Sequence, residues 1–235
     1  MSTEQITLKG ISSMATRQLL AQLTEQYERG TGQRVTFESV GGVNAEKRIL
    51  GGEQFDIIML ASGAMERLAA AGKIDRDSLV GVVNSSIAVA MKVGTTAPDI
   101  RDERSIRDAA KHAQAIGYST GPSGKYILGL LEKWGVSAGD GVTSPRLVEA
   151  RPGVPVGSLV ASGEVDIGFQ QISELMNVEG INLLGLLPDS IQKTTTFSAA
   201  MGSAMHNREA TQAFLKFLVS PAAEPAKVAH GMTAA

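Results

Sequence analysis

The chain has 235 residues, and its 22 lysines and arginines nearly balance its 24 aspartates and glutamates, giving a formal charge of −2. This balance excludes a strong binder of nucleic acids or of anionic membranes, because both attract proteins with a large excess of Lys and Arg. A hydrophobic fraction of 43% and a charged fraction of 20% are typical of a globular protein with a buried core.

Glycine is unusually frequent, at 26 residues, whereas aromatic residues make up only 4% of the chain. Glycine without a repeating period indicates tight turns and places where the backbone approaches a neighbour closely. Few aromatic rings disfavour a site that stacks bases or sugars. Because cysteine is absent and only three histidines occur, we expect no disulfide, no thiolate nucleophile, no metal centre and no cofactor.

The amino-terminal residues contain no basic segment followed by an apolar stretch, so we expect no secretory leader there. No apolar run approaches the ~18 residues that are needed to cross a bilayer, so we expect no membrane insertion. The chain as written is therefore predicted to be cytoplasmic, and it would be periplasmic if a leader had been removed.

Short apolar runs alternate with segments of helical period, which is typical of an α/β protein with largely parallel sheets. In the first third of the chain, strands are predicted over 6–8, 35–39 and 56–60, and helices over 14–29, 44–50 and 65–71. The three strand-to-helix junctions carry Ser12-Ser13, Gly41-Gly42 and Ser62-Gly63. In an open parallel sheet, such junctions lie at the carboxyl ends of the strands, where ligands bind.

The same alternation continues to the end of the chain. Strands are predicted over 86–91, 116–119, 146–149, 165–169 and 194–201, and 181–187 is apolar. Helices are predicted over 106–113, 126–134, 156–162 and 208–219. Residues 97–105, with Pro98 and charges of both signs, are predicted to form a surface loop.

The strongest single signal is the segment 118–125, in which a strand is followed by a glycine-rich turn that opens a helix. Such a turn exposes N–H groups at the positive end of the helix dipole, which suits an anionic oxygen. The spacing of a phosphate loop is absent, and an ordinary turn capped by Ser123 is the alternative. Since the junctions at Ser13, Gly42 and Ser62 have the same chemistry, we favour an anion held by neutral donors.

Two further features could serve such a ligand. Gln170-Gln171 follows a predicted strand at its carboxyl end, and paired amides there can bind a carboxylate, although a solvated loop is the alternative. Lys125, just inside a helix that starts at a candidate junction, could supply a counter-charge, or it could simply be solvated.

The junctions at Ser13, Gly41-Gly42 and Pro122-Ser123-Gly124, together with segments 163–168 and 214–221, resemble the periplasmic molybdate-binding proteins. The resemblance runs over about residues 6–232. It implies the type II periplasmic binding-protein fold: two α/β lobes with mixed, mostly parallel sheets and a ligand cleft between the lobes, closed by a hinge. It divides the chain into lobe I, 1–82 plus 196–235, and lobe II, 83–195.

The candidate ligand-binding residues are those of the junctions and those that the resemblance implies. They are Ser12, Ser13, Gly42, Val43, Ser62, Thr120, Ser123, Gly124, Lys125, Pro155, Val156, Gln170 and Gln171. Gly42 and Gln171 stand where the molybdate binders carry a serine and a tyrosine, which argues against molybdate as the ligand. Segments 41–43, 118–124, 153–157 and 168–175 instead resemble a branch of this fold that includes aconitate isomerase.

That branch implies an isomerase that acts on a small unsaturated di- or tricarboxylate by an allylic proton shift. The catalytic base stays open; Lys125, Tyr118 and Glu38 are candidates, and a lysine would need desolvation to lower its pKa. The alternative is a non-catalytic solute-binding protein for an oxyanion or carboxylate, whose partner would be an ABC permease only if the protein is exported. A ligand sensor with an added DNA-binding segment is a weaker hypothesis.

Overall fold

The computed structural model describes residues 7–235, and the chain divides into two compact units. Unit 1 comprises the chain up to Asn84 together with Thr196–Ala235, and unit 2 comprises Ser85–Thr195. Ile6, the first residue of the first predicted strand, lies outside the described residues. Within residues 7–235, no helix combines the length and the apolar character that crossing a membrane requires.

The sheet of unit 1 has six strands in the order β11-β4-β10-β3-β1-β2. Strands β1 (Leu8–Ser13), β2 (Val35–Val40) and β3 (Ile57–Ala61) are parallel, so their carboxyl ends meet at one edge. Strand β10 (Thr195–Met201) runs antiparallel to β3. The remaining strands are β4 (Val80–Ser85) and β11 (Thr233–Ala234), which also pair antiparallel.

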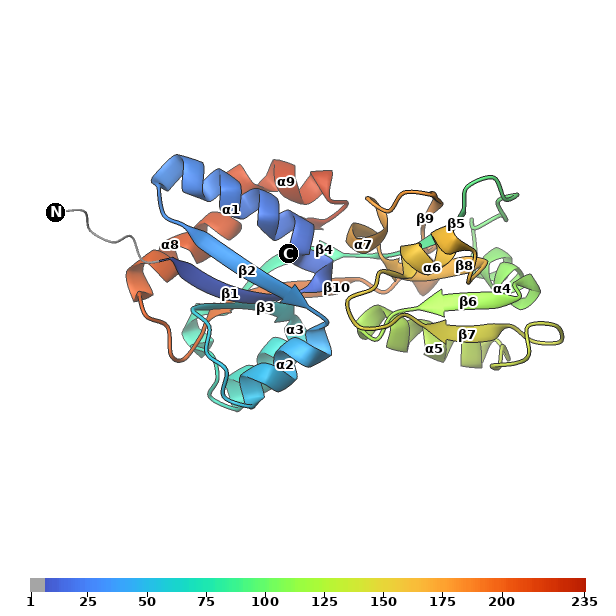
Figure 1. Ribbon diagram of the computed structural model, residues 1–235, viewed down its shortest axis with the longest axis horizontal. Coiled ribbons are helices and arrows are strands. Elements are labelled where there is room, and N and C mark those ends of the chain that lie inside the picture. The colour runs from blue at the N-terminus through green and yellow to red at the C-terminus, as the bar shows by residue number, and fades with distance from the viewer. Residues whose placement is uncertain (1–6) are drawn as a thin grey trace. The chain divides into compact units, whose positions relative to one another are not determined.

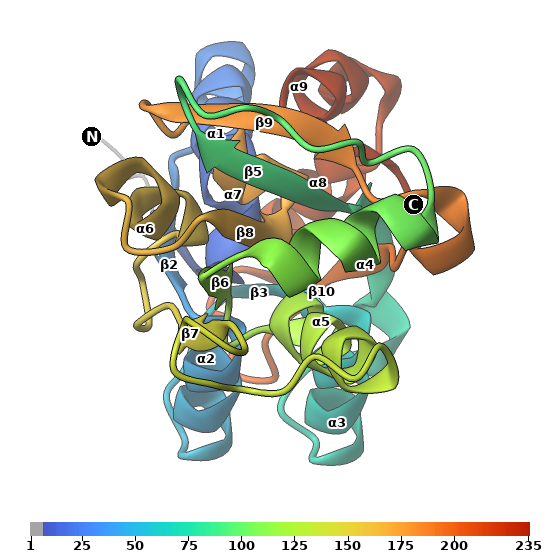
Figure 2. The same cartoon turned by 90° about the vertical axis from the view of Figure 1, so that its right-hand side faces the viewer.

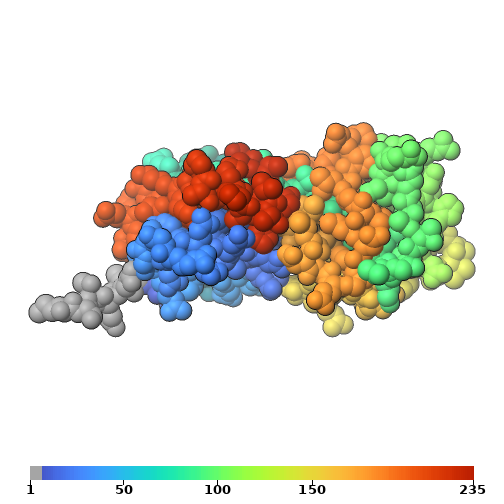
Figure 3. Space-filling model, turned by 90° about the horizontal axis from the view of Figure 1, so that it is seen from above, coloured from blue at the N-terminus to red at the C-terminus, as the bar shows by residue number. Residues whose placement is uncertain are grey.

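Helices cover both faces of this sheet (Figure 1). Helices α1 (Arg17–Thr31), α8 (Arg208–Leu218) and α9 (Glu224–Ala229) pack on one face around a core that includes Leu20, Phe197 and Phe214. Helices α2 (Gly42–Leu50) and α3 (Ser62–Ala70) pack on the other face around Ile11, Ile58 and Leu60. Figure 3 shows the C-terminal residues, in red, beside the first helix, in blue.

The sheet of unit 2 has five strands in the order β7-β6-β8-β5-β9. Strands β6 (Ala115–Tyr118), β7 (Arg146–Glu149) and β8 (Ile167–Gln171) are parallel. Strand β5 (Ile87–Lys92) runs antiparallel to both of its neighbours, β8 and β9 (Ile181–Leu186). Both sheets are therefore mixed, and the expectation that they are mostly parallel was too strong.

Helices also cover both faces of the second sheet (Figure 2). Helices α4 (Glu103–His112) and α5 (Pro122–Lys133) pack on one face around Ile116, Ile127 and Phe169. The short helices α6 (Val156–Ser162) and α7 (Ile172–Leu175) lie on the other face. Short 3-10 helices lie at Met14–Thr16, Arg76–Ser78, Asp189–Ile191 and Pro221–Ala223.

A pair of glycines determines how α6 sits on its sheet. Gly117 and Gly168 are register partners on β6 and β8. A Cβ added at either position would lie 2.9 or 2.8 Å from Cγ1 of Val156, the first residue of α6. Because both positions are bare, the start of α6 can pack directly on the sheet over β6 and β8. These glycines explain part of the glycine excess.

Several predicted boundaries were wrong. Strand β1 continues to Ser13, because its pairing with β2 extends from Leu8 opposite Val35 to Ser13 opposite Val40. Helices α2 and α3 begin two or three residues earlier than predicted, so the junction residues form their first turns. Helix α4 begins inside the predicted loop 97–105. Strand β4 and helix α9 were not predicted; each is stabilised by contacts with elements distant in sequence.

Candidate functional site

The carboxyl ends of β1, β2 and β3, with the helix starts that follow them, form a polar edge that we call the unit 1 rim. Ser12 lies there, but its side chain is fully buried and its Oγ lies 2.7 Å from Oγ of Ser39. This hydroxyl pair links β1 to β2. The prediction that Ser12 contacts a ligand is therefore not supported, since its hydroxyl is turned into the unit.

Ser13 and the start of α2 offer neutral donors at the same rim. Ser13 is half-buried, and its Oγ accepts a weak hydrogen bond from the Ala15 N–H at 3.4 Å. A Cβ built on Gly42 would lie 3.8 Å from this Oγ, so the hydroxyl faces the first turn of α2. The N–H groups of that turn have no partner four residues earlier within the helix. The Val43 side chain is exposed, so only its backbone N–H could serve an anion.

Ser62 begins α3, and its hydroxyl is held within unit 1. Its Oγ lies 2.7 Å from Oγ of Ser198 on β10 and 3.1 Å from the carbonyl oxygen of Thr196. Ser198 was not predicted as a site residue, because only the antiparallel pairing of β10 with β3 brings it to this rim.

The corresponding edge of unit 2 lies where β6, β7 and β8 end, and we call it the unit 2 rim. Helix α5 begins at Pro122 with Gly121 as its N-cap, so Ser123 does not cap the helix. Its buried Oγ lies 3.0 Å from Oγ of Ser119. Thr120 is half-buried, and its hydroxyl has no hydrogen bond to another described residue. The first turn of α5 and Thr120 therefore remain available to an anion.

Gly124 has a packing role at this rim. A Cβ added there would lie only 1.6 Å from the carbonyl oxygen of Ser119. The backbone of the turn can pack against α5 only because position 124 lacks a side chain.

Gln170 is part of β8 and is 2% exposed, so the alternative of a solvated loop was wrong. Its Oε1 accepts the Val156 N–H at 2.7 Å, and its Nε2 donates to Oε1 of Glu174 at 2.8 Å. Because an N–H can only donate, the Val156 bond determines which end of the amide is the oxygen. The Val156 N–H is thus engaged, and Pro155 has no N–H, so these predicted donors at α6 are not available to a ligand.

Gln171 is the last residue of β8 and is also buried. Its Nε2 donates to Oγ1 of Thr195 at 2.9 Å. Its Oε1 is buried without a partner among the described residues. Buried acceptors are normally satisfied, so this amide indicates a place for a ligand atom or a water molecule.

Glu174 was not among the predicted site residues. It lies on α7, four residues after Gln170, and its side chain is half-buried. Burial raises the pKa of its carboxyl to about 7, although the bond from Gln170 favours the charged form. The spacing of four residues was visible in the sequence, but the burial that perturbs the pKa was not.

The three predicted base candidates have different surroundings. Lys125 is exposed on α5, so the desolvation that a lysine base needs is absent. Tyr118 is half-buried, and burial together with the Glu149 carboxylate raises the pKa of its hydroxyl, which disfavours a phenolate base. Glu38 is exposed and binds both terminal nitrogens of Arg48, at 2.6 and 2.8 Å, and this pairing lowers its pKa.

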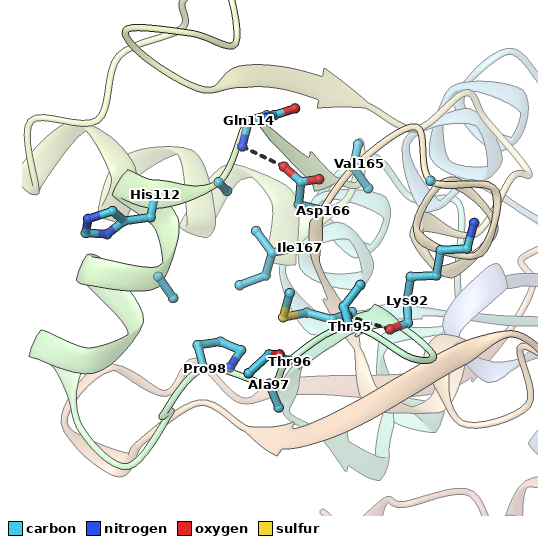
Figure 4. Close-up of a pocket in the computed structure, with 14 residues that line it drawn as sticks. Lys92, Thr95, Thr96, Ala97, Pro98, His112, Gln114, Val165, Asp166 and Ile167 are labelled. Atoms are coloured by element: carbon cyan, nitrogen blue, oxygen red, sulfur yellow. Dashed lines mark hydrogen bonds between the residues drawn. The ribbon is translucent and has the colours of Figure 1, made fainter.

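Unit 2 also contains a cavity of about 500 Å³ at the amino ends of β6 and β8, opposite its rim (Figure 4). Its wall includes Asp166, whose carboxylate accepts the N–H groups of Gln114 and Ala115 at 2.6 and 3.0 Å. No predicted site residue lines this cavity. Its size alone therefore does not make it the candidate site.

Comparison with known proteins identifies relatives along nearly the whole chain. Residues 8–233 match the family of bacterial extracellular solute-binding proteins. An aconitate isomerase from a Pseudomonas species is 32% identical over 219 residues, which are 91% of this chain and 82% of the relative.

Two solved structures share the fold. The periplasmic molybdate-binding protein of Azotobacter vinelandii has a TM-score of 0.78 at 20% identity, covering 97% of this chain and 99% of that one. The substrate-binding domain of a putative molybdenum ABC transporter from Clostridium difficile has a TM-score of 0.72 at 18% identity, with the same coverage. The predicted type II periplasmic binding-protein fold is confirmed, and this chain belongs to the bacterial extracellular solute-binding protein family.

Proposed function

We propose that this protein is an isomerase that binds a small unsaturated tricarboxylate of the aconitate kind and moves its double bond by an allylic proton shift. The observation that carries this proposal is the 32% identity to an aconitate isomerase over 91% of the chain. At that similarity and coverage, a shared ligand class is the simplest expectation.

The reaction needs a base and a set of donors but no redox step. A base removes a proton from the CH₂ group of the substrate, and the electron pair spreads over the adjacent double bond and its carboxylates. The proton then returns to the carbon at the far end of the allyl system, so the double bond moves and the atoms balance. Donors that bind the carboxylates more strongly as charge develops lower the barrier.

Both rims offer donors that suit carboxylates without adding formal charge. Unit 1 offers the Ser13 hydroxyl and the first-turn N–H groups of α2, beside Gly42. Unit 2 offers the Thr120 hydroxyl and the first-turn N–H groups of α5. Neutral donors hold a small anion strongly enough for reaction and still release the product.

The test is incubation of the protein with cis- and trans-aconitate in deuterated water, followed by NMR. Interconversion with deuterium incorporated at the allylic carbons is the expected result. Binding of both isomers with no interconversion would contradict the isomerase proposal.

A non-catalytic solute-binding function is the second candidate. The family consists of extracellular solute-binding proteins, and a molybdate-binding protein has the same fold. In that case, an ABC permease would be the partner and the protein would act outside the cytoplasm. A thermal-shift comparison of molybdate with trans-aconitate separates the two. Stabilisation by molybdate alone would favour the carrier, and stabilisation by the tricarboxylate together with turnover favours the isomerase.

A further inference from the structure

Glu174 holds a carboxyl group at the unit 2 rim, where β8 passes into α7. We infer that Glu174 is the proton-transfer residue of the proposed isomerisation: it takes the proton from one allylic carbon and returns it to the other. The inference deepens the proposed function and rests on it.

The carboxyl is held in one orientation by a chain of two hydrogen bonds. The Val156 N–H donates to Oε1 of Gln170, which turns the Nε2 of Gln170 towards Glu174. Nε2 then donates to Oε1 of Glu174 at 2.8 Å. Among the described residues, no donor is bonded to Oε2, so Oε2 is the oxygen that is open to accept and release a proton. A positioned carboxyl with one free oxygen is the arrangement that general base catalysis requires.

No charged group faces this carboxyl from the elements that pack against α7, which are β5, β8 and α6. Strand β8 and helix α6 contain no ionisable side chain. Strand β5 contains one, Lys92, but its amine lies beside Gly163, at the opposite end of α6 from Val156. A carboxylate without a cation in a half-buried place keeps its basicity, because no opposite charge stabilises the ionised form.

The titration of Glu174 agrees with this geometry. Burial raises its pKa from the ordinary value of 4.5 to about 7. A group with a pKa near the working pH can both remove and return a proton at neutral pH, as a single-base allylic shift demands. In this cycle the carboxylate takes the proton from the CH₂ carbon, and the resulting carboxylic acid gives it to the far allylic carbon, so the residue ends as it began.

The position of Glu174 places it with the other candidate groups of unit 2. Gly117 of β6 lies opposite Gly168 of β8. Ser119 and Thr120, which follow β6, and Gln170 and Gln171, the last two residues of β8, therefore come to the same edge of the sheet. Glu174 is tied directly to Gln170. Donors for a carboxylate and a group that can accept a proton thus share one rim.

The test compares the wild type with Glu174→Gln, Glu174→Asp and the control Glu179→Gln. Glu179 is an exposed carboxylate near the end of α7 that makes no ion pair with the described residues. Glu174→Gln preserves the oxygen that accepts from Gln170 but cannot accept a proton. We expect it to lower kcat for aconitate isomerisation at least 100-fold while the dissociation constant for trans-aconitate changes less than threefold, measured by calorimetry.

Two further readouts identify a proton-transfer role. The kcat of the wild type should rise with pH through an apparent pKa near 7, because the base must start ionised, and Glu179→Gln should keep both the rate and the profile. Glu174→Asp should keep a reduced rate with an altered profile. If the wild type isomerises aconitate and folded Glu174→Gln has a kcat within threefold of the wild-type value, the proposed role of Glu174 is wrong and the isomerase proposal stands. If the wild type binds aconitate without turnover, both are wrong.

Discussion

The two rims occupy equivalent places, at the carboxyl ends of three parallel strands, but their polar groups are organised differently. Paired hydroxyls occur at both rims: Ser12 with Ser39 and Ser62 with Ser198 in unit 1, and Ser119 with Ser123 in unit 2. In unit 2, amides bridge backbone and carboxyl groups, and the rim contains the titratable Glu174 and the unpartnered Oε1 of Gln171. Equivalent topology therefore supplies neutral hydroxyls at both rims, and the unit 2 rim adds an unpartnered amide oxygen and a half-buried carboxyl group.

The largest expected effect is a difference in stability between two glycine variants, one at a packed position in unit 2 and one at the unit 1 rim. Gly124→Ala should lower the free energy of unfolding by about 3 kcal/mol or more, because its Cβ would meet the Ser119 carbonyl oxygen at 1.6 Å. Gly42→Ala should change it by less than ~1 kcal/mol, because its Cβ would meet only Oγ of Ser13, at 3.8 Å. Urea unfolding of both variants measures the difference, and equal destabilisation would contradict it.

Next in size is a pH effect confined to unit 2. Between about pH 4.5 and 7, the native protein keeps a proton on Glu174 that the unfolded chain has released, so this residue lowers stability as the pH rises. Glu174→Gln removes that dependence. The unfolding free energy of Glu174→Gln minus that of the wild type should increase from pH 4.5 to pH 7. Above pH 7 this difference should stay constant, at up to about 3 kcal/mol.

The measurement is urea unfolding at several pH values from 4.5 to 8, with Glu179→Gln as the control. A difference between Glu174→Gln and the wild type that stays constant with pH would contradict the raised pKa of Glu174.

A smaller effect distinguishes the two adjacent glutamines of β8. Gln170→Leu leaves the Val156 N–H buried without its acceptor, so we expect a loss of about 2 kcal/mol in unfolding free energy. Gln171→Leu should destabilise the protein less, because one end of that amide already has no partner. Urea unfolding at pH 6 compares the two, and a larger loss for Gln171→Leu would reverse our assignment of their roles.

The smallest expected effect lies in unit 1. Ser13→Ala should weaken binding of trans-aconitate about tenfold, equivalent to about 1.4 kcal/mol, because it removes a surface donor. Ser12→Ala should leave the affinity unchanged within threefold and lower stability by about 1 kcal/mol, since its buried hydroxyl bonds Ser39. Calorimetry and urea unfolding test the pair. If only Ser12→Ala weakened the binding of trans-aconitate, the ligand contact would belong to Ser12, and our assignment to Ser13 would be wrong.

The site was only partly predictable. The junctions at Ser13, Gly42 and Ser123 were visible because serine and glycine at helix starts are local signals. The roles of individual residues were not visible in the sequence. Gly124 allows the turn at Ser119 to pack against α5, and the Val156 N–H is already bonded to Gln170. Glu174 was overlooked, because a glutamate on a short helix carries no sign in the sequence that it will be buried.

The sequence by itself determined the fold class, because the alternation of apolar runs and helical periods along the chain admits few architectures, and it determined the neutral chemistry of the junctions. Tertiary structure decided which of those groups face outwards. Ser12 and Ser39 are 27 residues apart, and Ser62 and Ser198 are 136 apart, yet each pair is hydrogen-bonded. Burial and hydrogen bonding depend on such distant neighbours, and so do the availability of a hydroxyl and the pKa of a carboxyl.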